Sequence, residues 1–79
     1  NVEMQFDKSL TGVIIDRFGK DVEIKKADDN NFTICVDIAV SPVFFGWLMS
    51  LGTKGKVLGP AWVKREFGKN CKKILNYYK

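Results

Sequence analysis

Hydrophobic and polar residues alternate with a period of two in several segments of the chain. The first is 2–6, and this alternation is typical of a half-buried strand. The same pattern runs through 21–26 and 32–38. The polar run at 28–31 between them has the composition of a tight turn, so the two segments predict an antiparallel hairpin. A further short strand is expected at 56–58.

Three other segments have the spacing of helices. Apolar residues of 10–18 recur every three or four positions, and Gly19 supplies the C′ position that ends this helix. Ser41 and Pro42 suit the N-cap and first position of a second helix, which is apolar nearly all round and is therefore expected to be deeply packed or to lie at an interface. A third helix is expected at 61–78.

The predicted order of elements is β-α-β-β-α-β-α. This order predicts an α+β fold, a ferredoxin-like split β-α-β sandwich (β-α-β-β-α-β) with an added C-terminal helix. The antiparallel sheet would carry the first two helices on one face. With 79 residues and 46% hydrophobic content, the chain is expected to form one domain, 1–79. It begins without methionine inside a predicted strand, so we interpret it as a fragment of a longer protein.

The composition argues against an enzyme. Histidine is absent, which excludes imidazole acid–base chemistry and the Ser-His-Asp and Cys-His nucleophile arrangements. Cys35 and Cys71 are too few and too isolated for a zinc site, and we expect both to be buried free thiols. Asp28 and Asp29 are adjacent turn residues whose side chains point apart, so a turn role is favoured over a catalytic one. No catalytic residue, metal ion or cofactor is therefore expected.

Charge is unevenly distributed along the chain. Residues 1–53 carry a net charge of −3, whereas residues 54–79 carry a net charge of +7. On the last predicted helix, four cationic side chains fall within an arc of about 100°, opposite an apolar stripe. The stripe consists of Val63, Phe67, Cys71, Ile74 and Tyr78. Two interpretations stay open: a surface that binds phosphates or an acidic partner, and a solvated face that keeps the domain soluble. The four residues are Arg65, Lys69, Lys72 and Lys73.

Aromatic residues supply the other candidate contacts. Trp62 lies in the first turn of the last helix, off its apolar stripe, and is the preferred aromatic contact to a partner domain or ligand. In the apolar second helix, core packing is favoured over base stacking for Phe44 and Trp47. The same helix nevertheless supplies the interface candidates, which are Phe44, Phe45, Trp47 and Leu48.

Nothing in the sequence indicates a secretory signal or a membrane span. The first residues lack an apolar core region, and the longest apolar stretch, 39–51, is interrupted and too short to cross a bilayer. A cytoplasmic location without a membrane partner is the expectation.

The C-terminal half resembles a known family. Residues 45–52 read Phe-Gly-Trp-Leu-Met-Ser-Leu-Gly, 56–60 read Lys-Val-Leu-Gly-Pro, and 63–66 read Val-Lys-Arg-Glu, with a final Tyr77-Tyr78. In this order they resemble the C-terminal extension that follows the WYL domain in bacterial transcriptional regulators of the DeoR/YafY-like group. The resemblance is strongest over residues 43–78 and rests on layout before that.

The resemblance implies a non-catalytic domain that dimerises a DNA-binding regulator and relays its effector signal. Its partners would be the WYL and helix-turn-helix domains of the parent chain and a second copy in a homodimer, and the parent protein would bind DNA rather than this domain directly. The alternative function is a nucleic-acid or nucleotide (phosphate) binding module that uses the basic C-terminal helix. The Trp-Tyr-Leu motif of the WYL domain is not in this chain, so no ligand residue of that domain is carried over.

Overall fold

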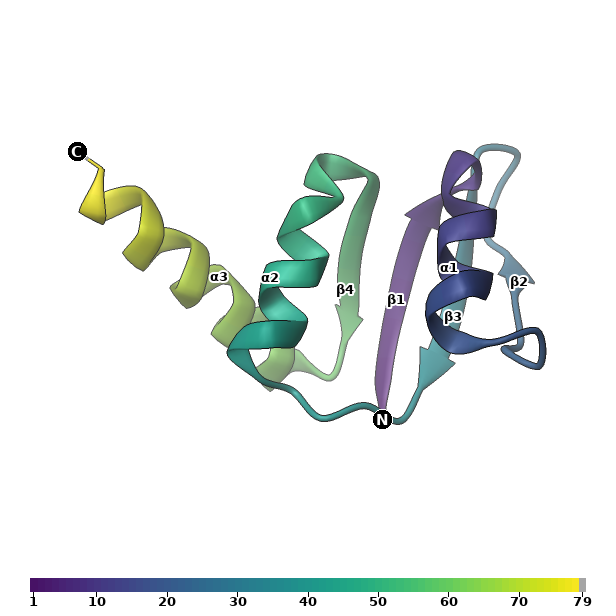
Figure 1. The fold of residues 1–79 in the computed structure, drawn as a ribbon, viewed down its shortest axis with the longest axis horizontal. Coiled ribbons are helices and arrows are strands. Elements are labelled where there is room, and N and C mark those ends of the chain that lie inside the picture. The colour runs from purple at the N-terminus through teal and green to yellow at the C-terminus, as the bar shows by residue number, and fades with distance from the viewer. Residues whose placement is uncertain (79) are drawn as a thin grey trace.

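The computed structural model describes residues 1–78, in which four strands form one antiparallel sheet. The order across the sheet is β2-β3-β1-β4, so β1 and β3 are central and β2 and β4 are edges (Figure 1). The strands are β1 (Val2–Asp7), β2 (Lys25–Lys26), β3 (Asn31–Val36) and β4 (Gly55–Gly59).

Alternation along the central strands places their apolar residues on one face. In the antiparallel register, Met4 pairs with Ile34 and Phe6 with Phe32, and all four side chains are buried. The intervening residues, such as Gln5 and Thr33, point to the other face. The predicted strand at 2–6 is therefore confirmed, and the one predicted at 32–38 is confirmed up to Val36, where β3 ends.

Three α-helices complete the fold: α1 (Thr11–Phe18), α2 (Pro42–Ser50) and α3 (Ala61–Tyr77). Short 3-10 turns, Lys8–Leu10 and Gly52–Lys54, precede α1 and follow α2. As predicted, α1 ends at Gly19, whose positive φ of 92° suits a residue without a Cβ. The sequence therefore predicted the mixed α and β content and the order of elements.

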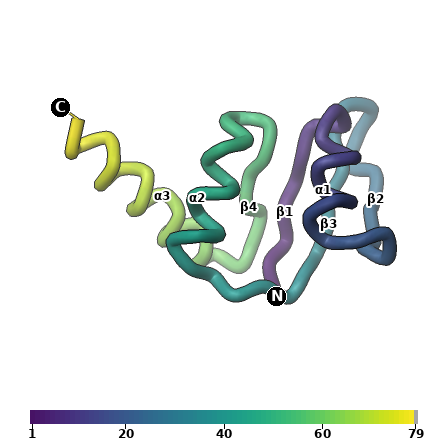
Figure 2. Tube along the Cα trace, viewed as in Figure 1, coloured from purple at the N-terminus to yellow at the C-terminus, as the bar shows by residue number. Residues whose placement is uncertain are grey.

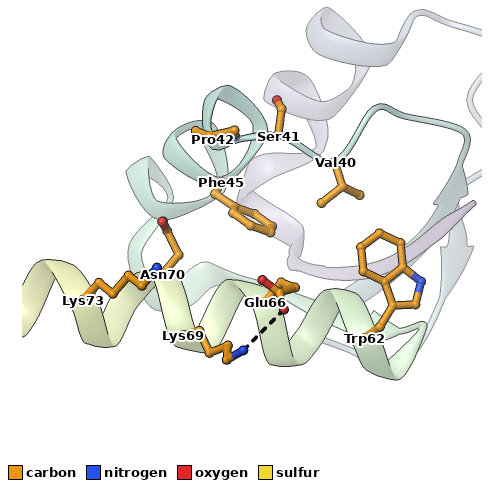
Figure 3. A pocket seen from close by; sticks show the side chains of 9 residues that line it. All are labelled: Val40, Ser41, Pro42, Phe45, Trp62, Glu66, Lys69, Asn70 and Lys73. Atoms are coloured by element: carbon orange, nitrogen blue, oxygen red, sulfur yellow. Dashed lines mark ion pairs between the residues drawn. The ribbon is translucent and has the colours of Figure 1, made fainter.

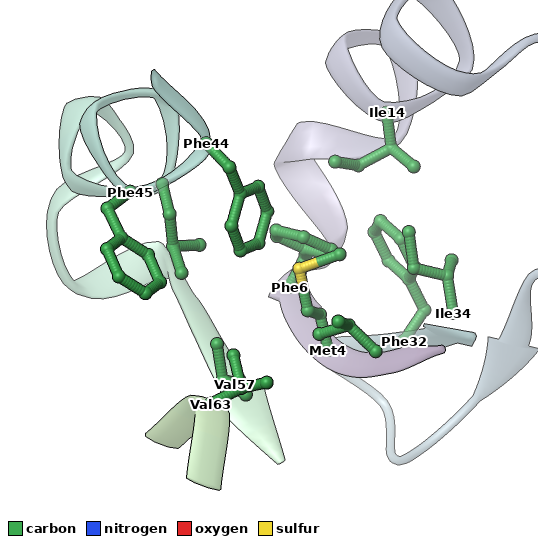
Figure 4. Packing of buried hydrophobic residues seen from close by; sticks show 11 residues of the cluster. Met4, Phe6, Ile14, Phe32, Ile34, Phe44, Phe45, Val57 and Val63 are labelled. Carbon is green, nitrogen blue, oxygen red and sulfur yellow. The ribbon is translucent and has the colours of Figure 1, made fainter. Parts of the chain in front are cut away.

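The core lies between the sheet and the helices α1 and α2. Met4 and Phe6 of β1 occupy its middle, between Ile14 of α1 and Phe44 of α2 (Figure 4). Because residues from both helices join the same cluster, α1 and α2 cover the same face of the sheet. The side chains that complete the cluster are Val2, Phe32, Ile34, Phe45, Leu48, Val57 and Val63.

The hairpin differs from its prediction in the length of its first strand. Only Lys25 and Lys26 pair with β3, so the expected strand at 21–26 is wrong over its first four residues. A turn follows α1 directly, in which the Val22 N–H donates to the Gly19 carbonyl oxygen at 3.3 Å. This turn includes Asp21 and Val22, the first two residues of the strand that the alternation predicted.

The cysteines also differ in part from expectation. Both are free thiols, as expected, but Cys35 is exposed and Cys71 is only partly buried. Cys35 lies on β3 between the buried residue Ile34 and the partly buried Val36, so alternation directs its side chain to the face opposite the core. The expectation that both thiols are buried is therefore wrong.

Helix α3 extends beyond the rest of the fold. It begins beside the end of β4 and runs away from the sheet, so its last turn lies far from the N-terminus (Figure 2). The molecule measures 38 × 22 × 21 Å along its principal axes. Within residues 1–78, no helix has both the length and the apolar character that a membrane span requires.

Candidate functional site

The start of α2 forms one side of the candidate site. Ser41 has extended backbone angles and accepts a hydrogen bond from the Phe44 N–H through its Oγ at 3.3 Å. Pro42 occupies the first helical turn, where a missing N–H costs nothing. This cap fixes the point at which the chain turns from the loop after β3 into α2, and it brings Val40 and Phe45 toward α3.

The start of α3 forms the other side. The carbonyl oxygen of Pro60 accepts from the N–H groups of Val63 at 3.1 Å and Lys64 at 3.3 Å, which begins the helix directly after β4. Val63 is fully buried and anchors this first turn in the core. Farther along, the rings of Phe45 and Phe67 lie 5.4 Å apart between centroids and join α2 to α3.

A groove of about 580 Å³ lies between these two helices (Figure 3). Its volume falls in the range of small-molecule sites, about 300–1,000 Å³. One wall is mostly apolar, and the other presents an indole, two ammonium groups, a carboxylate and an amide. The lining residues are Val40, Ser41, Pro42, Phe45, Trp62, Glu66, Lys69, Asn70 and Lys73.

The structure divides the five predicted contact residues into two groups. Trp62, Lys69 and Lys73 line the groove, because they recur at intervals of seven and four residues and so share one face of α3. Arg65 and Lys72 are exposed on α3 but do not line the groove. Only two of the four residues in the predicted basic arc, Lys69 and Lys73, therefore line the same groove as Trp62.

Charge pairing within the groove is weak. The Lys69 Nζ lies 3.8 Å from the Glu66 Oε1, and both side chains are more than half exposed. Such a pair contributes little in water, about 0–1 kcal/mol. In residues 1–78, Lys73 forms no ion pair. The ammonium groups of the groove are thus available to an anion.

The interface candidates of α2 lie in the core or at its margin. Phe44, Phe45 and Leu48 are buried against the sheet and α3, so their side chains are not available to a partner as they stand. Trp47 is partly buried, and its ring lies 5.6 Å from that of Phe18 between centroids. The Arg17 guanidinium carbon lies over the Trp47 ring, 5.2 Å from its centroid. The apolar character of α2 therefore reflects packing within the chain.

Exposed apolar side chains gather instead at the end of α3. Tyr77 and Tyr78 are about four-fifths exposed, and Leu75 is more than half exposed. Ile74 belongs to the predicted apolar stripe of this helix, yet it is 40% exposed because the sheet does not reach this far. The predicted stripe is thus covered only in the first half of α3.

The shifted pKa values belong to turns. The pKa of Asp28 is lowered by hydrogen bonds from the Asn30 N–H and the Asn31 side chain, and that of Asp7 by hydrogen bonding with the Ser9 side chain and then with the Ser9 N–H. Both carboxylates are exposed and cap local backbone. Among residues 1–78, no charged side chain is buried and no cluster of three metal-binding side chains occurs.

Sequence reasoning did not identify the opposite wall of the groove. Phe45 was predicted to lie at an interface and Val40 was given no role, and only the fold places the two in one groove with Trp62. Glu66 and Asn70 carried a signal that could have been used: they follow Trp62 at intervals of four residues, so they lie on its side of the helix.

Comparison with known proteins gives a match to one family. The family model described as the WCX domain matches residues 1–75. This range starts before β1, includes the whole groove and ends in α3 just before the exposed tyrosines. Searches of the curated proteins and of the solved structures gave no match.

Proposed function

Because this chain belongs to the WCX domain family, found at the C-terminus of WYL-type transcriptional regulators, we propose that it is the non-catalytic assembly and signal-relay domain of such a regulator. The family match over residues 1–75 is the observation that carries the proposal. The parent chain then supplies a WYL domain and a helix-turn-helix, and the parent rather than this domain binds DNA, in the cytoplasm.

Assembly as a homodimer is supported by the exposed end of α3. Leu75, Tyr77 and Tyr78 are exposed there, and the rings of the two tyrosines lie 5.3 Å apart between centroids. Exposed apolar and aromatic side chains of this kind are typical of contact surfaces. We therefore assign the dimer contact to this end of α3 rather than to the buried residues of α2.

The ferredoxin-like arrangement forms part of the proposal. The sheet order β2-β3-β1-β4, with β1 between β3 and β4 and all pairs antiparallel, supports a split β-α-β layout with both crossing helices on one face. In this layout α3 is an addition that leaves the sandwich from the edge strand β4. An added helix of this kind can join the domain to a neighbour without disturbing the sheet.

A second function, binding of nucleic acid or a nucleotide through phosphate, is favoured by the charge of α3. Arg65, Lys72 and Lys73 have no acidic partner in residues 1–78, and residues 54–79 carry a net charge of +7. Each phosphate that these cations neutralise would release counterions and make the affinity dependent on salt.

The test of assembly is the solution mass of the chain over a concentration series. We expect a dimer that dissociates on dilution, and Leu75→Glu should shift the mass to that of a monomer, because it places a charge in the apolar contact. Val13→Glu is the matched control, since Val13 is an exposed apolar residue on α1. A chain that stays monomeric at high micromolar concentration would contradict the assembly function.

A further inference from the structure

We propose that the groove between α2 and α3 binds a nucleotide, with its base stacked on Trp62 and its phosphate held by Lys73 and Lys69. This inference rests on the phosphate-binding function proposed above and assigns that function to one site. It requires three features in one cavity: an accessible aromatic surface, unpaired cations at a distance from it, and polar groups between them.

Trp62 provides the aromatic surface. Half of its side chain is exposed, although it lies next to the fully buried Val63 in the first turn of α3. Its indole stands across the groove from Val40, at the end opposite Lys73 (Figure 3). A nucleobase that enters this gap would be covered by the indole on one side and by the Val40 side chain on the other.

Lys69 and Lys73 provide the cations. They lie one turn apart, about 6 Å along the helix, and begin about 10 Å from Trp62. Their flexible stems allow both ammonium groups to reach one phosphate. Lys73 has no ion pair in residues 1–78, and Lys69 has only its exposed pair with Glu66. A phosphate would replace that weak pair at small cost.

Glu66 and Asn70 orient the ligand. The Glu66 carboxylate lies between Trp62 and Lys69 along the helix, so it repels phosphate from the aromatic end and accepts hydrogen bonds from amino groups of a base. Asn70 lines the groove on the side of Lys73, where its amide can donate to a phosphate oxygen. The groove thus has an aromatic end and a cationic end, which correspond to the base and the phosphate of a nucleotide.

The chemistry favours a nucleotide over an acidic peptide. A carboxylate side chain would satisfy Lys73 but would leave the Trp62 indole without a planar partner and would approach Glu66. A base and a phosphate on one molecule use both ends at once. The ligand is a free nucleoside monophosphate or one unit of a single strand, and both present the same chemistry to these residues.

The experiment is a titration of the chain with adenosine monophosphate and with a short single-stranded oligodeoxyadenylate, followed by indole fluorescence and amide chemical shifts. We expect quenching of Trp62 and shifts confined to the groove. Trp62→Leu should weaken binding about fivefold or more, because base–aromatic stacking is lost. Adenosine and ribose 5-phosphate, which lack the phosphate and the base respectively, should bind less tightly than the nucleotide.

The matched pair Lys73→Gln and Lys72→Gln separates the groove from general charge. The two variants remove the same charge from neighbouring positions, but only Lys73 lines the groove. We expect Lys73→Gln to weaken binding at least threefold more than Lys72→Gln at the same salt concentration. Amide spectra of the unliganded variants check that each is folded.

The outcomes distinguish this site from the function on which it rests. If the mononucleotide binds and its binding requires Trp62 and Lys73, the groove is supported as a nucleotide site. If only the oligonucleotide binds, with the same two residues required, the ligand is single-stranded nucleic acid. A third outcome is that Lys72→Gln and Lys73→Gln weaken the affinity for the oligonucleotide equally and Trp62→Leu leaves it unchanged. This result would keep the phosphate-binding function and overturn the groove as its site. Absence of binding to both ligands at low salt overturns both. Displacement of the nucleotide by an acidic peptide, together with no effect of Trp62→Leu, overturns the groove as a nucleotide site.

Discussion

At the scale of single residues, Gly55 lies where β4 passes close to the ring of Phe6. A Cβ at position 55 would come within 2.9 Å of the Phe6 Cδ1 and Cε1 atoms and within 3.3 Å of the Leu51 Cδ1. Phe6 is fully buried in the middle of the core and cannot move aside freely. The missing side chain of Gly55 thus allows β4 to join the sheet over this ring.

Gly55→Ala should therefore destabilise the chain by about 1–3 kcal/mol, because the added methyl overpacks the core. Gly46→Ala is the control: a Cβ at this position in α2 meets nothing within 4 Å. This second variant should stabilise the chain by about 0.5–1 kcal/mol through helix propensity. The free energies of unfolding in urea give both values, and equal effects of the two changes would contradict the close approach.

The turn carboxylates Asp7 and Asp28 predict a dependence of stability on pH. Local hydrogen bonds lower the pKa of each below its ordinary value of 3.8, chiefly from the Ser9 side chain and N–H for Asp7 and from the Asn30 N–H and the Asn31 side chain for Asp28. A lowered pKa in the folded chain means that the stabilisation is complete above the unfolded value and is lost as the pH falls below about 4 toward the folded value. We expect the urea midpoint to fall between pH 5 and pH 3.

The double variant Asp7→Asn/Asp28→Asn should lose less of its urea midpoint over the same pH interval, since it no longer carries these two titrations. Asp29→Asn is the control, because Asp29 lies in the same turn and accepts neither of these hydrogen bonds. A pH dependence that is unchanged in the double variant would show that other carboxylates account for it.

At the scale of elements, α3 has two halves with different roles. Its first turn is anchored by the fully buried Val63, and its middle packs Phe67 against Phe45. From Ile74 onward the apolar side chains are exposed. The stability of the domain should therefore depend on the first half of the helix only.

Val63→Ala should cost about 2 kcal/mol, from lost burial and the cavity that remains. Leu75→Ala should change the free energy of unfolding by less than about 0.5 kcal/mol, since Leu75 is mostly exposed and alanine favours the helix. Urea unfolding at a concentration where the chain is monomeric measures both. A similar loss from the two substitutions would mean that α3 packs along its whole length.

The elements themselves were largely predictable from periodicity. The alternation in β1 and β3, the Ser41-Pro42 start of α2 and the glycine after α1 each carry a local signal that the fold retains. The first strand of the hairpin was not predictable in this way. Val22 continues the apolar alternation of a strand, but in the structure it belongs to the turn after Gly19.

The candidate site was predictable only on one side. Trp62, Lys69 and Lys73 share a helical face that spacing reveals. Their relation to Phe45 depends on how α2 and α3 diverge from the sheet, and no local pattern encodes that angle. The role of α2 has the same limit: a buried helix and a helix at a partner surface can both be apolar nearly all round, and the sequence alone does not distinguish them.

At the scale of the whole molecule, cooperative stability should be concentrated in the sheet. The central strands β1 and β3 each have a neighbouring strand on both sides, whereas β2 has only two paired residues and the end of α3 stands apart. We expect native-state hydrogen exchange to be slowest in β1 and β3 and fastest in β2 and the last turns of α3.

Repeating the exchange measurement at higher protein concentration tests the assembly proposal at the same time. Protection should rise at Leu75 and its neighbours but not in β2, because a second copy would cover only the end of α3. Protection that is independent of concentration throughout the chain would argue against a dimer contact at this helix.

The projecting half of α3 has a mechanical consequence. Tyr77 lies ten positions after Phe67, the last strong contact with the core, which corresponds to a rigid arm of about 15 Å. Tilting this arm by about 10° about Phe67 sweeps its tip through about 2.6 Å. A small change in the spacing of α2 and α3, which leaves the sheet undisturbed, thus produces a larger displacement of the tyrosines at the end of the arm.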